Sequence, residues 1–78
     1  MANRKRVKYD DKHYIDILVC KRSDAMGWTL EFGIEEHGAD IIETMFYSKE
    51  AFSTSEEAVK AGVVLGCREI ERGFQTVA

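Results

Sequence analysis

The chain has 78 residues, of which 45% are hydrophobic and 32% are charged, and its formal net charge is −3. This length supports one domain with a small core, and the composition is that of a folded globule, which excludes a disordered chain. No apolar run is long enough to span a bilayer, and the N-terminus lacks the apolar segment of a secretory signal. We therefore expect a cytoplasmic domain that does not enter a membrane.

The chain begins with a cluster of basic side chains. The cluster consists of Arg4, Lys5, Arg6 and Lys8. We interpret residues 1–12 as a flexible basic N-terminal arm ahead of a single domain at residues 13–78. A basic arm on an acidic body can also attract phosphate groups. Nucleic-acid binding through these four residues, with Tyr14 or Tyr47 stacking on bases, is therefore the alternative function.

Three segments have the composition and alternation of β-strands, at about residues 13–20, 28–35 and 41–47. Short connections between successive strands favour an antiparallel meander. The third segment allows two registers, because a slip of one residue exchanges its faces. The alternatives bury either Ile42, Thr44 and Phe46 or Ile41, Met45 and Tyr47. We favour the register that places Ile42 and Phe46 in the core.

A helix is predicted at about residues 55–72. Thr54 and Glu57 have the spacing of a capping box, and Gly73 is a typical stop signal. Gly62 and Gly66 lie on the apolar side of this helix, where the absence of a side chain permits a close approach to the sheet. The predicted fold class is α+β, with a three-stranded antiparallel meander and one C-terminal helix packed across one face.

The residues that most often carry chemistry do not form a recognisable site. The thiols and imidazoles are Cys20, Cys67, His13 and His37, and their spacing matches neither a metal site nor a Cys–His pair. We expect both cysteines to be buried, reduced thiols and both histidines to be exposed. The sequence therefore predicts a protein that is not an enzyme and that has no catalytic residues, metal site, cofactor or small-molecule substrate.

The sheet face turned away from the helix is the candidate partner surface. One helix covers one face, so the apolar residues of the other face remain available for contacts. In the favoured register these residues are Tyr14, Leu18, Cys20, Ile41, Met45 and Tyr47. The candidate partner residues among them are Tyr14, Leu18, Met45 and Tyr47. We expect this surface to bind a protein partner or a second copy of the chain, and we favour a protein over nucleic acid as the partner.

Two resemblances accompany this interpretation. The order β-β-β-α is similar to that of small nucleic-acid-binding domains such as the AP2 type, but acidic residues stand here where those domains present arginine and lysine. The stretches "GWTLEFGIE" and "FSTSEEAVKAGVVLGCREIERG" resemble a group of short uncharacterised bacterial proteins. The positions of this second resemblance are Trp28, Phe52, Thr54, Glu56, Glu57, Ala58, Ala61, Gly62, Gly66, Arg68 and Ile70. It implies a bacterial source and the β-β-β-α fold, and it brings no activity.

Overall fold

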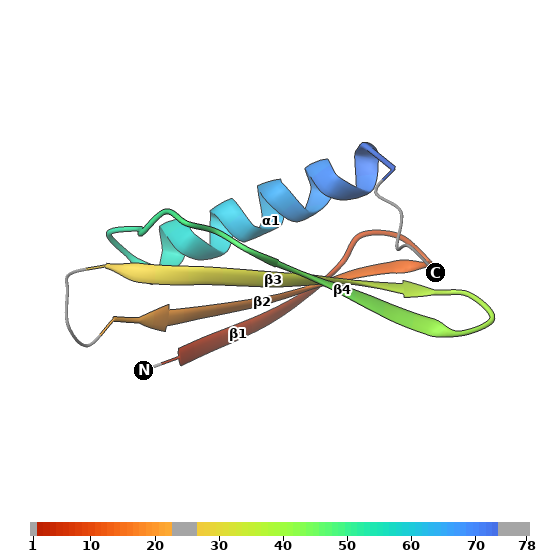
Figure 1. Cartoon of the computed structure of the whole chain (residues 1–78), viewed down its shortest axis with the longest axis horizontal. Helices are drawn as coiled ribbons and strands as arrows, with labels where there is room; N and C mark the ends of the chain where they lie inside the picture. Colours follow the sequence, from red (N-terminus) through yellow and green to blue (C-terminus); the bar gives the residue numbers. More distant parts are fainter. Residues whose placement is uncertain (1, 23–26, 74–78) are drawn as a thin grey trace.

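The computed structural model describes residues 2–22 and 27–73, which form one antiparallel sheet with a helix across one face (Figure 1). The elements are β1 (Ala2–Lys8), β2 (His13–Lys21), β3 (Trp28–His37), β4 (Ile41–Tyr47) and α1 (Ser55–Glu71). The strands lie in the order β1-β2-β3-β4, so each pairs with its neighbours in sequence. The predicted α+β class and antiparallel meander are confirmed, but the prediction of three strands is wrong because the sheet has four.

The additional strand comes from the segment that the sequence analysis interpreted as a flexible arm. β1 pairs with β2 along its whole length, with Val7 opposite Ile15 and Arg6 opposite Asp16. The turn between the two strands is held by Asp10, whose carboxylate accepts hydrogen bonds from the backbone N–H groups of Lys12 and His13. Met1, the first residue of the predicted arm, lies outside the described residues.

The register of β4 follows from its pairing with β3. Phe46 lies opposite Phe32, and the two rings are stacked with centroids 5.0 Å apart. We call the sheet face toward α1 the inner face and the opposite one the outer face. The favoured register is confirmed, because Ile42, Thr44 and Phe46 lie on the inner face. The prediction that Ile42 is in the core is wrong, since its side chain is 43% exposed.

The ends of α1 agree closely with the prediction. The hydroxyl of Thr54 accepts a hydrogen bond from the backbone N–H of Glu57 at 3.1 Å. The carboxylate of Glu57 accepts a hydrogen bond at 2.8 Å from the hydroxyl of Ser53, which differs from the bond to the backbone N–H of Thr54 expected in a capping box. Gly73 has a φ of +68° just beyond the helix, a value that favours glycine. These local signals determine where the helix begins and ends.

The core lies between α1 and the two central strands. Its buried residues are Ile15, Ile17, Val19, Leu30, Phe32, Ile34 and Ala58. A methyl group added at Gly62 would lie 3.0 Å from Leu30 Cδ1, and one added at Gly66 would lie 2.8 Å from Ile15 Cγ2. The two glycines therefore set how closely the helix approaches the sheet, as the sequence predicts.

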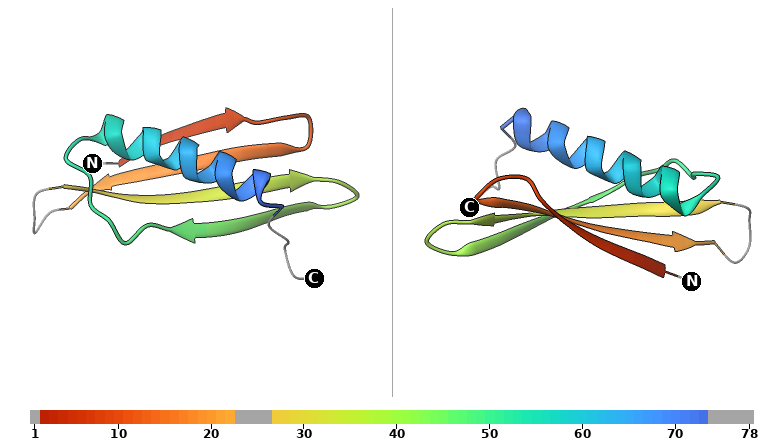
Figure 2. Two further views of the ribbon diagram at one scale, coloured as in Figure 1. Left: turned by 90° about the horizontal axis from the view of Figure 1, so that it is seen from above. Right: turned by 180° about the vertical axis from the view of Figure 1, so that it is seen from behind.

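The helix covers only part of the inner face. It packs against β2, β3 and the margin of β1. Figure 2 shows α1 crossing the sheet obliquely, with β4 lying along the uncovered side. Consequently β4 carries apolar side chains that no described element covers, and Ile42 is exposed for this reason.

Candidate functional site

The outer face combines charged residues near β1 with apolar residues on β4. Because side chains alternate along a strand, the strand register determines which residues share this face. Its members are Ala2, Arg4, Arg6, Lys8, Tyr14, Asp16, Leu18, Cys20, Thr29, Glu31, Gly33, Glu35, His37, Ile41, Glu43, Met45 and Tyr47. The face therefore has a basic side, an acidic centre and an apolar side.

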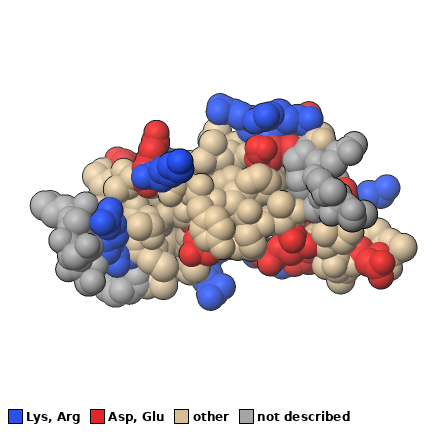
Figure 3. Space-filling view, viewed as in Figure 1, with Lys and Arg blue, Asp and Glu red and all other residues tan. Residues whose placement is uncertain are grey.

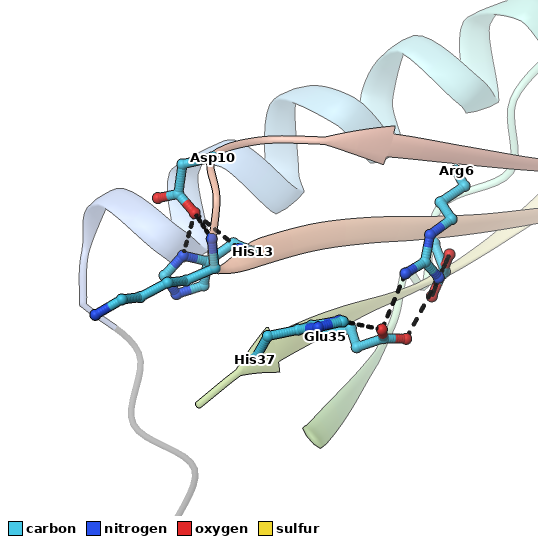
Figure 4. Close-up of polar contacts among 7 residues, drawn as sticks. Arg6, Asp10, His13, Glu35 and His37 are labelled. Carbon is cyan, nitrogen blue, oxygen red and sulfur yellow. Dashed lines mark hydrogen bonds and ion pairs between the residues drawn. The ribbon is translucent and has the colours of Figure 1, made fainter. Parts of the chain in front are cut away.

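Arg6 organises the centre of this face (Figure 4). Its guanidinium group donates hydrogen bonds to Asp16 at 3.1 Å and to Glu35 at 2.9 Å. It also lies over the ring of Tyr14, with the guanidinium carbon 4.4 Å from the ring centroid. The hydrogen bond to Glu35 raises the pKa of Arg6, and the same bond lowers the pKa of Glu35. Arg6 thus links three of the four strands electrostatically.

A third carboxylate lies beside this pair. Asp16, Glu35 and Glu43 each offer an oxygen within 4.8 Å of the other two, a spacing that could hold a metal ion. Arg6 already supplies positive charge to two of them. Desolvation raises the pKa of Glu43, and so does a hydrogen bond that its protonated carboxyl group shares with Asp16. The cluster is therefore short of positive charge when all three groups are ionised.

This shortage predicts a pH-dependent stability effect of Glu43→Gln. A raised folded-state pKa means that Glu43 favours folding below its unfolded-state pKa of about 4.3 and loses that contribution as pH rises through the folded value. At pH 7 the variant should gain up to about 0.5 kcal/mol of unfolding free energy, and the gain should vanish below about pH 4. Urea denaturation at both pH values measures this.

Glu31→Gln is the matched control for this experiment. Glu31 lies on the same face but opposite Tyr47, whereas Glu43 lies opposite Glu35. The stability change of Glu31→Gln should depend less on pH. An equal gain in both variants, or a loss of stability in Glu43→Gln at pH 7, would show that the cluster does not strain Glu43.

Both histidines interact with carboxylates and are half-buried, so the expectation that they are exposed is wrong. His13 Nδ1 lies 2.8 Å from Asp10 and His13 Nε2 lies 3.1 Å from Glu36. The Nε2 atom of His37 lies within hydrogen-bond distance of Glu35. Desolvation would raise the pKa of Asp10, but hydrogen bonds from His13 and the backbone outweigh it and lower that pKa. Each imidazole thus interacts with at least one carboxylate near the end of a β-hairpin.

The apolar side of the outer face is formed by β4. The exposed fractions are 65% for Ile41, 43% for Met45 and 71% for Tyr47. Met45 lies across Gly33, where an added methyl group would lie 2.7 Å from its sulfur. A shallow hollow of about 620 Å³ extends from Met45 past Leu18 toward β1. Large apolar side chains and a hollow therefore meet on one surface.

The structure places all four candidate partner residues on the outer face. Tyr14 lies between Arg6 and the ring of His37, whose centroid is 5.0 Å away, so it belongs to the charged centre. Leu18 and Met45 line the hollow, whereas Tyr47 is exposed on the same face. Ile41 lies on the same face, opposite His37, as the favoured register of β4 predicts.

The four basic residues of the predicted arm are divided between the faces. Arg4, Arg6 and Lys8 lie on the outer face, whereas Lys5 pairs with Ile17 on the inner face. Lys8 forms an ion pair with Asp11 at 3.5 Å. No local signal in the sequence indicates the contacts of Arg6, because Asp16 and Glu35 are 10 and 29 residues away.

Comparison of the chain with protein-family models, with curated proteins and with solved structures gives no match. Within residues 2–22 and 27–73, no helix is long and apolar enough to cross a membrane. Cys20 and Cys67 are free thiols, but both are half-buried, so the expectation that they are buried is wrong.

Proposed function

We propose that this protein is a non-enzymatic interaction module that binds a protein partner through the outer face of its sheet. The observation that carries this proposal is the exposure of Tyr47, Ile41 and Met45 on a face that α1 does not cover. Exposed apolar patches beside fixed polar groups are typical of protein contact surfaces. The hollow next to Leu18 offers room for a side chain of the partner.

The charges of this face support a protein partner over nucleic acid. Its three basic side chains stand among four carboxylates, which are Asp16, Glu31, Glu35 and Glu43. Arg6 is already engaged by two of these carboxylates, and Lys8 by Asp11. Phosphate contacts supply much of the affinity for nucleic acid, and carboxylates oppose them. A polypeptide with apolar side chains and mixed charges suits the surface better.

We further propose that the partner is met in the bacterial cytoplasm. The free thiols of Cys20 and Cys67 suit a reducing compartment. The resemblance of the strand at Trp28 and of the helix to short bacterial proteins supports the same source.

Affinity capture from a bacterial lysate, with the chain immobilised, tests the outer face. Leu18→Lys and Tyr47→Lys should each reduce the recovery of the partner about tenfold or more, since each places a charge in the contact. Val64→Lys is the matched control, because Val64 is 54% exposed on α1 and should retain the partner. Equal recovery by all three variants would exclude the outer face, and salt-sensitive recovery of nucleic acid would favour the alternative function.

A further inference from the structure

The two edges of the sheet differ sharply in character. β1 presents Arg4, Lys5, Arg6 and Lys8, and charged residues of this kind protect an edge strand from pairing with other chains. β4 has one charged residue, Glu43, and no proline. Among the described residues, six large hydrophobic side chains are exposed, and four of them are on β4. β4 is therefore the unprotected edge.

The unpaired backbone groups of β4 can be assigned from the ladder. The N–H of Ser48 donates to the carbonyl of Leu30 at 3.0 Å, which marks these two as a hydrogen-bonded pair. Such pairs alternate along antiparallel strands, so Ile42, Thr44 and Phe46 also bond toward β3. The N–H and C=O groups of the intervening residues point away from the sheet. These residues are Ile41, Glu43, Met45 and Tyr47.

We propose that β4 pairs antiparallel with β4 of a second copy of the chain. The two four-stranded sheets then form one eight-stranded sheet, and the two-fold axis passes through Thr44. This inference goes beyond the proposed function, because it concerns the edge of β4 and a second copy of the chain, whereas the proposed function concerns the outer face. Exposed strand edges bind extended chains through backbone hydrogen bonds. These bonds supply affinity, and the side chains supply specificity. Here the two edges that meet are identical.

The composition of β4 selects this register. An axis at Thr44 pairs all seven residues and places Glu43 opposite Met45 of the second copy, and Ile41 opposite Tyr47 of the second copy. An axis at Glu43 would place two carboxylates opposite each other, which is unfavourable. An axis at Met45 would leave Ile41 and Ile42 without partners on β4. The register at Thr44 thus pairs Ile41 with Tyr47 and Ile42 with Phe46, and it avoids placing the two Glu43 carboxylates directly opposite each other.

The inner face offers room for this arrangement. Because α1 lies over β2 and β3, the helix does not obstruct the edge of β4. Figure 3, in which the β4 side faces the reader as in Figure 1, shows an area free of Lys, Arg, Asp and Glu across the middle of the molecule. In the dimer, Ile42 would lie opposite Phe46 of the second copy on this face and lose much of its 43% exposure. The two-fold axis produces two such contacts between Ile42 and Phe46, and burial of their apolar surface favours association.

Sedimentation and cysteine crosslinking together test this proposal. In a Cys20→Ser, Cys67→Ser background, Thr44→Cys places two thiols opposite each other in a non-hydrogen-bonded pair. The Cα atoms of such a pair are about 4.5 Å apart, within the range of disulfides. Ile42→Cys is the matched control, because its copies would lie about 14 Å apart along the strands. Thr44→Cys should therefore form a covalent dimer at least about tenfold faster than Ile42→Cys under mild oxidation.

Two lysine variants distinguish dimerisation through the β4 edge from contacts through the outer face. Ile42→Lys lies on the inner face and should convert the sedimenting dimer into a monomer, whereas Leu18→Lys should leave the dimer intact. A monomeric wild-type chain at all concentrations, or faster crosslinking by Ile42→Cys, would overturn the β4 pairing. Dissociation by Leu18→Lys alone would also overturn it and leave the outer face as the contact. Partner capture that is lost in Leu18→Lys and kept in Ile42→Lys tests the proposed function independently of the dimer.

Discussion

Gly66→Val is expected to lower the free energy of unfolding by about 2–3 kcal/mol. The reason is the closeness of Ile15, whose Cγ2 and Cδ1 atoms lie 2.8 and 2.9 Å from the position of an added methyl group. Ile15 is completely buried and β-branched, so it cannot move aside without disturbing its neighbours. A chain of this length has a total stability of about 4–12 kcal/mol, so the loss is substantial.

Urea denaturation monitored by circular dichroism measures this loss. Lys60→Val is the matched control, since it introduces the same β-branched residue at an exposed position of α1 and reports only the cost in helix propensity. A second substitution, Ile15→Ala, should restore part of the packing in the Gly66→Val background, so the two changes should not be additive. Equal losses in Gly66→Val and Lys60→Val would mean that the helix does not rest on Ile15.

Phe46→Ala should lower the free energy of unfolding by about 2 kcal/mol, less than the loss for a fully buried phenylalanine because this ring is half-buried. Its ring stacks on Phe32 in the core and holds β4 to the sheet. Tyr47→Ala, one residue later, should change stability by no more than about 0.5 kcal/mol, because Tyr47 is 71% exposed. The pair of variants reports which side of β4 is buried.

Thermal and urea unfolding should be compared at low protein concentration, so that association does not contribute to the measured stability. The opposite ranking, with the greater loss in Tyr47→Ala, would place β4 in the other register. That outcome would also move Ile41 and Met45 to the core and remove the basis of the outer-face surface.

The elements predicted best are those with local signals. Thr54 and Gly73 mark the ends of α1 through hydrogen bonds and a backbone angle that involve residues within four positions. The alternation from Trp28 to Ile34 likewise predicts β3 and its buried side, because a two-residue period records which face meets the core. Both features can be recognised without knowledge of the rest of the chain.

β1 could not be predicted in this way. Val7 is its only large apolar residue, so the strand lacks the alternation that reveals β3. What supports it is the pairing with β2 and the contacts of Arg6 with Asp16 and Glu35, which are distant in sequence. The same reason applies to one contact of His13, because this residue meets Glu36 only after β2 and β3 have paired. Contacts between strands carry information that short windows of sequence do not contain.

The basic residues of β1 also determine how far an assembly can grow. If two copies join along β4, a strand that carries Arg4, Lys5, Arg6 and Lys8 lies at each outer end of the combined sheet. Two such ends repel each other, and no β4 edge remains for either of them to meet. Assembly therefore closes at two subunits, whereas a chain with two apolar edges could extend into an open-ended fibre.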